Sequence, residues 1–226
     1  MSRRYFKQNN FLTLGCGKTF HPNLPPNFDE PSSWSQEMPY FPLIGQKCNS
    51  DKKGPGTWPD AKIVTPASDK FCGVEAPDET FFDWMAANYT IVAMNLAKST
   101  SRPFAFFTGF RRPHVPWAFP ARFWNAYPEA SELGAPLHRL PPTNMPEVAY
   151  TQTAFSSATV NGVDYTYNFT TALPTNVTLV LRKAYYAAVS WTDSQIGRVL
   201  DEVEKLEYQN NTVAVSYTHL TLPTKA

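Results

Sequence analysis

Two segments of the chain place a histidine beside cationic side chains directly after an apolar run. The run at 104–107 leads into the sequence GFRRPHVPW at 109–117, and the run at 11–14 leads into GKTFHP at 17–22. Arginine and lysine bind oxyanions, and histidine can transfer a proton near neutral pH. This combination of residue types suits a site for an anionic substrate.

The apolar runs have the length of strands, and the ends of those strands would position the polar side chains. Ligands of α/β sheets bind at the carboxyl ends of the strands, so the two strand ends could share one site. Lys18 would supply a point charge and His21 a base or a donor. Pro113 and Pro116 restrict the backbone around His114 and would present it rigidly. Taken alone, each segment could be an ordinary surface turn with solvated charges.

The rest of the chain predicts alternating helices and strands. Periodic apolar residues predict helices at 77–98 and at 176–208. The continuous apolar run 104–107 predicts a central strand buried on both faces, and the β-branched run 211–215 predicts a further strand. The segment 129–175 is long and rich in turns. This order of elements favours an α/β sheet with helices on both of its faces.

Composition limits the class of protein. Of the 226 residues, 20 are Lys or Arg and 19 are Asp or Glu, and the net charge of +1 gives no global field suited to nucleic acid. Hydrophobic residues make up 42% of the chain, enough for one sizeable core. No run of about 18 apolar residues predicts a membrane span.

Three blocks of the sequence together resemble one known family. They are GKTFHP at 17–22, GFRRPHVPW at 109–117 and the helical block RKAYYAAVSWTDSQIGRVL at 182–200. In this order they are similar to the sulfatases of the alkaline-phosphatase superfamily, in the iduronate-2-sulfatase-like branch. The resemblance implies that residues 1–215 form part of a catalytic domain with an alkaline-phosphatase-like α/β fold.

The resemblance also implies a reaction and roles for individual residues. Sulfatases hydrolyse sulfate esters with a formylglycine made from cysteine and with a divalent cation, expected here to be Ca²⁺ in the complete enzyme. Lys18 would contact the sulfate and the formylglycine hydroxyl, which His21 would orient or deprotonate. His114 would bind the sulfate and protonate the leaving alkoxide. Arg111 and Arg112 would bind the substrate or face solvent. The expected substrate is a sulfated carbohydrate of the uronate or glycosaminoglycan type.

Several parts of the family pattern are missing from the chain. The nucleophilic C-x-P-S-R, an early Asp-Asp pair, and a late Asp-His-Gly with its following Lys are absent. We therefore expect no metal ligands in this chain and no activity from the chain alone. Residues 216–226 are interpreted as a non-native tail. Two alternatives stay open, namely a phosphatase or phosphodiesterase of the same superfamily and a non-catalytic glycoprotein remnant.

Cysteines and sequons favour a lysosomal or secreted protein. Cys48 and Cys72 flank a polar segment and could form a disulfide, and the corresponding loop of the resembling branch also looks disulfide-closed. Cys16 is expected to be a buried thiol. Residues 1–8 lack the apolar region of a signal peptide, so we expect that residue 1 is not the natural start. Four N-x-S/T sequons are candidate glycosylation sites, at Asn88, Asn168, Asn176 and Asn210. The sequence does not indicate an oligomeric state.

Overall fold

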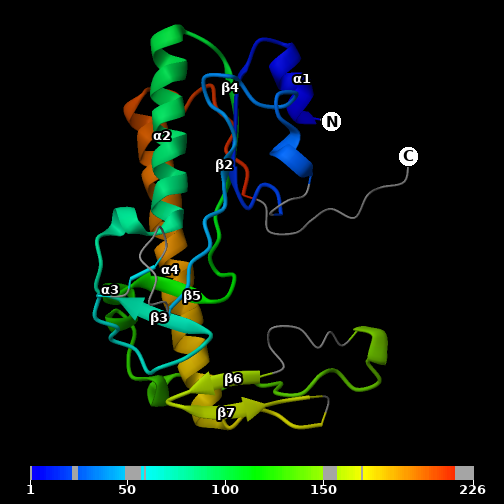
Figure 1. The fold of residues 1–226 in the computed structure, drawn as a ribbon, viewed down its shortest axis with the longest axis vertical. Coiled ribbons are helices and arrows are strands. Elements are labelled where there is room, and N and C mark those ends of the chain that lie inside the picture. Colours follow the sequence, from blue (N-terminus) through cyan, green and yellow to red (C-terminus); the bar gives the residue numbers. More distant parts are fainter. Residues whose placement is uncertain are drawn as a thin grey trace.

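Helices and strands alternate along the chain, and the strands of two separate sheets run parallel (Figure 1). The computed structural model describes residues 2–21, 25–48, 57–58, 60–149, 157–168 and 170–216. The helices are α1 (Ser2–Gln8), α2 (Phe82–Thr100), α3 (Ala121–Asn125) and α4 (Thr175–Lys205), with short 3₁₀ turns η1 (Pro26–Asp29), η2 (Asp78–Thr80), η3 (Ala130–Glu132) and η4 (Glu147–Ala149). The strands are β1 (Leu12–Gly17), β2 (Phe41–Pro42), β3 (Phe71–Val74), β4 (Phe104–Gly109), β5 (Trp117–Pro120), β6 (Ser157–Val160) and β7 (Val163–Thr166). The α/β class expected from the sequence is confirmed.

The larger parallel sheet has the strand order β2-β1-β4. β1 pairs with β4 from Leu12 opposite Phe104 to Gly17 opposite Gly109, and the end of β1 also pairs with β2. Every residue of β1 is buried, because strands flank it and helices cover its faces. The prediction that 104–107 is a central strand buried on both faces is wrong. β4 pairs with β1 alone among the described strands, so it forms an edge and is half-buried throughout.

The two faces of this sheet pack against different elements, as expected. Leu12 and Leu14 point toward helix α2, where they share a core cluster with Ala86 and other small residues. Helix α1 lies across the opposite face, as Figure 1 shows. On that face the indole of Trp34 packs so close to Gly15 that a Cβ on this glycine would lie 2.4 Å from the ring. Only glycine fits there without displacing the indole.

A second parallel sheet, β3 with β5, builds the other half of the core. The pairing runs from Phe71 opposite Trp117 onward, and the sheet packs on α3 and α4 around the buried indole of Trp191. Cys48 and Cys72 are joined by a disulfide with a Cα–Cα distance of 5.5 Å, and both belong to this cluster. The disulfide therefore ties the segment before residue 49 to strand β3.

Helix α4 passes through both halves of the molecule and packs along α2 (Figure 1). Its 31 residues span about 46 Å at the usual rise per residue. It is the helix predicted at 176–208, and η2 with α2 is the helix predicted at 77–98. The turn-rich segment 129–175 contains the hairpin β6–β7. In the described part of the chain, no helix combines the length and the apolar character that crossing a membrane requires.

The predicted strand at 211–215 is absent from the structure. Residues 212–216 have no regular structure, and Val213 and Val215 are largely exposed. A β-branched run forms a strand where it has an edge to pair with, and no described strand lies beside this one. The tail interpreted as non-native falls outside the described residues from position 217 onward.

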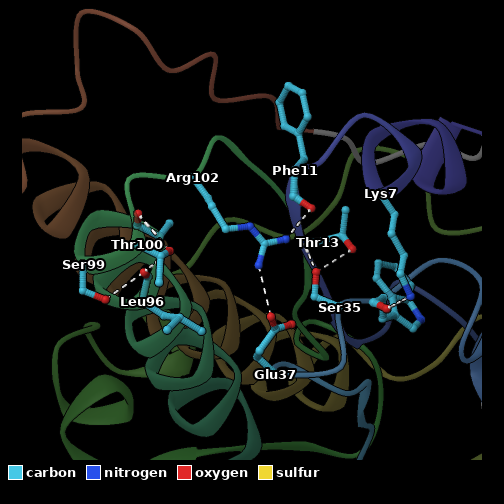
Figure 2. Close-up of polar contacts among 11 residues, drawn as sticks. Lys7, Phe11, Thr13, Ser35, Glu37, Leu96, Ser99, Thr100 and Arg102 are labelled. Atoms are coloured by element: carbon cyan, nitrogen blue, oxygen red, sulfur yellow. Dashed lines mark hydrogen bonds and ion pairs between the residues drawn. The ribbon is translucent and has the colours of Figure 1, made fainter.

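Polar contacts hold the amino ends of β1 and β4, at the opposite end of the sheet from the charged loops (Figure 2). Arg102 pairs with Glu37 at 3.1 Å and donates to the Phe11 carbonyl at 3.4 Å. The Thr13 N–H donates to Ser35 Oγ at 2.9 Å. These contacts fix where the two strands start, and the strands' common register then fixes where they end.

Candidate oxyanion site at the carboxyl ends of two strands

Strands β1 and β4 end side by side, which confirms that the two cationic segments lie together. The Lys18 N–H donates to the Gly109 carbonyl at 2.9 Å, and Thr19 Oγ1 donates to the Phe107 carbonyl at 2.5 Å. A Cβ on Gly109 would lie 2.0 Å from the Thr19 nitrogen, and a Cβ on Gly17 would lie 2.0 Å from the Gly109 oxygen. Gly17 also has a φ of +56°, which favours glycine. Both glycines are needed for this close approach.

A tyrosine hydroxyl holds the first loop, residues 18–21, through two hydrogen bonds. The Tyr40 hydroxyl donates to the Gly17 carbonyl at 2.6 Å and accepts the Phe20 N–H at 3.1 Å. One side-chain oxygen thus holds the backbone on both sides of Lys18, whose own side chain is half-buried. The loop presents Lys18 from a backbone with little freedom.

The second loop, residues 110–116, turns so that the His114 N–H donates to the Arg111 carbonyl at 2.9 Å. His114 Nδ1 lies 2.6 Å from the Val115 carbonyl. A carbonyl only accepts, so Nδ1 carries the proton and Nε2 is the basic nitrogen of the neutral ring. The residue as a whole is exposed, and its ring is partly buried. His114 can therefore take up a proton at Nε2 and donate it to a bound anion.

Lys18, Arg111 and His114 lie close enough for their charges to interact. Burial lowers the pKa of Lys18, and the charge of Arg111 lowers it further. Burial also lowers the pKa of His114; the Val115 carbonyl opposes this, and the charges of Arg111 and Lys18 add to it. Burial lowers the pKa of Arg111, and Asp83 opposes that shift. Mutually repelling cations favour a bound anion, because the anion relieves their repulsion.

Arg112 is turned into the protein and is 3% exposed. Its Nε donates to the Ala118 carbonyl at 2.8 Å, and its Nη2 donates to Gln46 Oε1. The Arg112 carbonyl accepts a hydrogen bond of 3.3 Å from Thr192 of α4. Burial lowers the pKa of Arg112 to about 10, so it remains a cation at neutral pH. These contacts brace the second loop internally, whereas Arg111 is half-buried and its Nη2 donates to the Val115 carbonyl at 3.3 Å.

Asp83, in the first turn of α2, is a charged residue of this region that the sequence reasoning missed. It is fully buried, and its Oδ1 accepts the Arg111 N–H at 2.6 Å. Burial raises the pKa of its carboxyl group, and the charges of Arg112 and Arg111 oppose the rise. The sequence did contain a signal for it. Asp83 precedes Ala87 by one helical turn and lies on the apolar side of a predicted helix, where a charged group requires a partner.

His21 follows Lys18 in the first loop, at the end of the described stretch 2–21, and is exposed. Its place in the loop fits a role beside Lys18. That role stays a prediction.

A divalent metal, which the resemblance implies, needs several oxygen or imidazole ligands around one point. Within the described ranges, no three His, Cys, Asp or Glu side chains come together in a way that could hold one. Lys18 and Arg111, which lie beside His114 at this site, are cationic and would repel a metal. The described residues therefore do not fit a metal centre, and no step of the chemistry below is assigned to one.

Of the predicted sequons, those at Asn168, Asn176 and Asn210 are exposed. Asn88 is half-buried within α2, and the Thr90 hydroxyl of its sequon is buried and bonded inside the helix. The asparagines of three of the four sequons are therefore exposed on the folded chain. Glycosylation at any of them stays a prediction.

The fold and the charged loops define an α/β protein with a cluster of cationic side chains and a histidine at adjoining strand ends. The model of the family described as Sulfatase matches residues 23–218, a range that includes the second loop and the helical block at 182–200. The chain belongs to the sulfatase family.

Curated relatives agree with this assignment. The chain is similar to the iduronate 2-sulfatase of Homo sapiens, with 29% identity over 214 residues, covering 93% of this chain and 38% of that protein. The iduronate 2-sulfatase of Mus musculus gives 29% over 215 residues with the same coverage. A protein of Formosa agariphila named Sulfatase is 27% identical over 228 residues, covering 95% of this chain and 40% of that protein. The chain thus spans about two fifths of the length of these relatives.

Proposed function

We propose that this chain forms the sulfate-binding side of a sulfatase active site, in a protein that hydrolyses sulfate esters of uronate- or glycosaminoglycan-type glycans. The observation that carries the proposal is the convergence of Lys18, Arg111 and His114 at adjoining strand ends in a member of the sulfatase family. The substrate class is supported by the similarity to iduronate 2-sulfatases.

Each group would act through its charge or its proton. Lys18 and Arg111 would hold sulfate oxygens, and His114 would donate Nε2–H to the ester oxygen as the alkoxide leaves. Burial and neighbouring cations keep the pKa of the free His114 below its ordinary value. A bound sulfate ester would raise that pKa, so substrate binding would favour the protonated ring. His21 would orient or deprotonate the attacking hydroxyl.

The attacking hydroxyl would come from outside this sequence, because no C-x-P-S-R occurs in it. Ca²⁺ would belong to the complete enzyme. A lysosomal or secreted location is supported by the Cys48–Cys72 disulfide and by the exposed sequons. We therefore expect the chain alone to bind sulfate without hydrolysing sulfate esters.

Binding of inorganic sulfate tests the proposal. The chain is titrated with sodium sulfate at low ionic strength while the His114 ring is followed by NMR. We expect Lys18→Met and His114→Gln to weaken binding by about tenfold or more, which corresponds to roughly 1.4 kcal/mol. Lys62→Met, which removes an exposed cation paired with Glu75, is the control and should bind like the wild type.

Two results would count against this account. If Lys18→Met bound sulfate with the affinity of the wild type, the proposed sulfate site would be wrong. Turnover of an aryl sulfate by the chain alone would show that the nucleophile is not supplied from outside the sequence.

A further inference from the structure

A buried carboxylate lies directly behind the cations of the candidate site. Asp83 is 0% exposed, and its Oδ1 accepts the Arg111 N–H at 2.6 Å. Its Oδ2 is also buried and has no hydrogen-bond partner among the described residues. A carboxylate in such surroundings is costly unless nearby charges stabilise it. An ionised Asp83 therefore lowers the stability of the fold, and a functional role would account for its presence.

The stabilising charges come from the second loop. Arg112 and Arg111 both favour the ionised form of Asp83, and Asp83 in turn favours the charged forms of both arginines. The carboxylate therefore offsets part of the positive charge that Arg111 and Arg112 bring to the end of strand β4. Without it, the same cations would repel one another with no opposing charge behind them.

The element that carries Asp83 is rigid. The carboxylate lies in the first turn of α2, where the helix dipole favours a negative charge. The neighbouring Phe82 and the buried Ala86 pack this turn against strand β1. The hydrogen bond that the Arg111 N–H donates to Asp83 thus ties the second loop to a packed helix turn.

We propose that Asp83 is a positioning residue of the candidate site. By accepting the Arg111 N–H, it sets the second loop so that Arg111 and His114 lie beside Lys18. This rests on the proposed function only in taking sulfate as the ligand of the site. Asp83 itself is fully buried, so it would act on a bound anion only through the loop.

Two variants of the full 226-residue chain separate the acceptor from the charge. Asp83→Ala removes both, so we expect the His114 ring to change its chemical shift and its titration, and the Kd for inorganic sulfate to rise about tenfold. Asp83→Asn keeps an acceptor for the Arg111 N–H and loses only the negative charge. We expect it to keep the His114 ring shift and to bind sulfate as tightly as the wild type or more tightly.

Val177→Ala is the control for lost stability, because Val177 is buried in α4 within the other core cluster. It should destabilise the chain and leave the His114 titration and the sulfate Kd unchanged. Asp83→Ser, whose hydroxyl is too short to reach the Arg111 N–H, replaces Asp83→Ala if that variant does not fold.

An unchanged His114 titration and sulfate Kd in Asp83→Ala would overturn the proposal. Equal weakening by Asp83→Asn and Asp83→Ala would also overturn it, because Asn retains the acceptor. If the wild-type chain does not bind sulfate, the proposed function fails, and the His114 titration of the two variants still decides the role of Asp83.

Discussion

The imidazole of His114 lies between a carbonyl that favours its proton and three cations that oppose it. Burial is the largest influence and lowers the pKa, the Val115 carbonyl raises it, and Arg111, Lys18 and Arg112 lower it. In the free chain the ring is therefore neutral at neutral pH. An anion placed against the same cations reverses the balance, because it favours the imidazolium form.

Sulfate binding should therefore strengthen as the pH falls. His114 has a higher pKa in the sulfate-bound form than in the free form. The affinity for sulfate therefore rises as the pH falls from near the ordinary pKa of histidine to values below it. The measurement is the sulfate Kd between about pH 8 and pH 5. His114→Gln should flatten this dependence, and a wild-type Kd that does not change with pH would contradict the assignment of His114 to the site.

The sequence predicted which residue types form the candidate site and which segments carry them, but not where each side chain points. Arg111 and Arg112 are neighbours of the same type, and no pattern in the sequence separates them. The structure does so through the acceptors that Arg112 meets inside the protein, above all the Ala118 carbonyl and Gln46. Those partners come from distant parts of the chain, so the difference depends on tertiary structure.

At the scale of elements, the position of the first loop depends on Tyr40, which lies in an irregular stretch just before strand β2. Tyr40 precedes β2 and reaches across to the end of β1, where its hydroxyl bonds the Gly17 carbonyl and the Phe20 N–H. The residue is 6% exposed. Removing the hydroxyl would leave the buried Gly17 carbonyl and the half-buried Phe20 N–H without this partner.

Tyr40→Phe should lower the free energy of unfolding by about 1–3 kcal/mol, the usual cost of leaving buried polar groups unpaired. It should also weaken sulfate binding, because the backbone around Lys18 would be less constrained. Chemical denaturation and the sulfate titration measure the two effects. Tyr5→Phe, at a residue that is 62% exposed, is the control and should change stability by less than about 0.5 kcal/mol. If Tyr40→Phe behaves like this control, Tyr40 does not position the loop.

The elements themselves were predictable to different degrees. The long helices followed from apolar periodicity, because each carries a row of buried small and aromatic residues, such as Ala86 and Ala93 on α2 and Trp191 on α4. Strand 104–107 was placed correctly but was expected in the middle of the sheet, since an apolar run indicates burial and does not identify its neighbours. The run 211–215 has the composition of a strand, and composition alone supplies no partner for it.

At the scale of the whole molecule, two core clusters meet at one point of the chain. Phe81 belongs to the cluster around Trp191, and Phe82 belongs to the cluster around β1, although the two residues are adjacent. Both are 0% exposed. Helix α2 begins at this point, and α4 packs along it, so both halves of the molecule pack against the same pair of helices.

This shared junction predicts that the two halves unfold together. Phe81→Ala and Phe82→Ala should each lower the free energy of unfolding by about 3–5 kcal/mol, because each leaves a cavity in a core cluster. Both variants should weaken protection against hydrogen exchange equally at the amides of β1 and of β3, since loss of either cluster destabilises the other through α2. Val92→Ala, at an exposed position of the same helix, should leave protection unchanged. If Phe81→Ala exposed only the β3 amides and Phe82→Ala only the β1 amides, the clusters would be independent, and the site at the end of β1 would not rely on the disulfide-bearing half of the molecule.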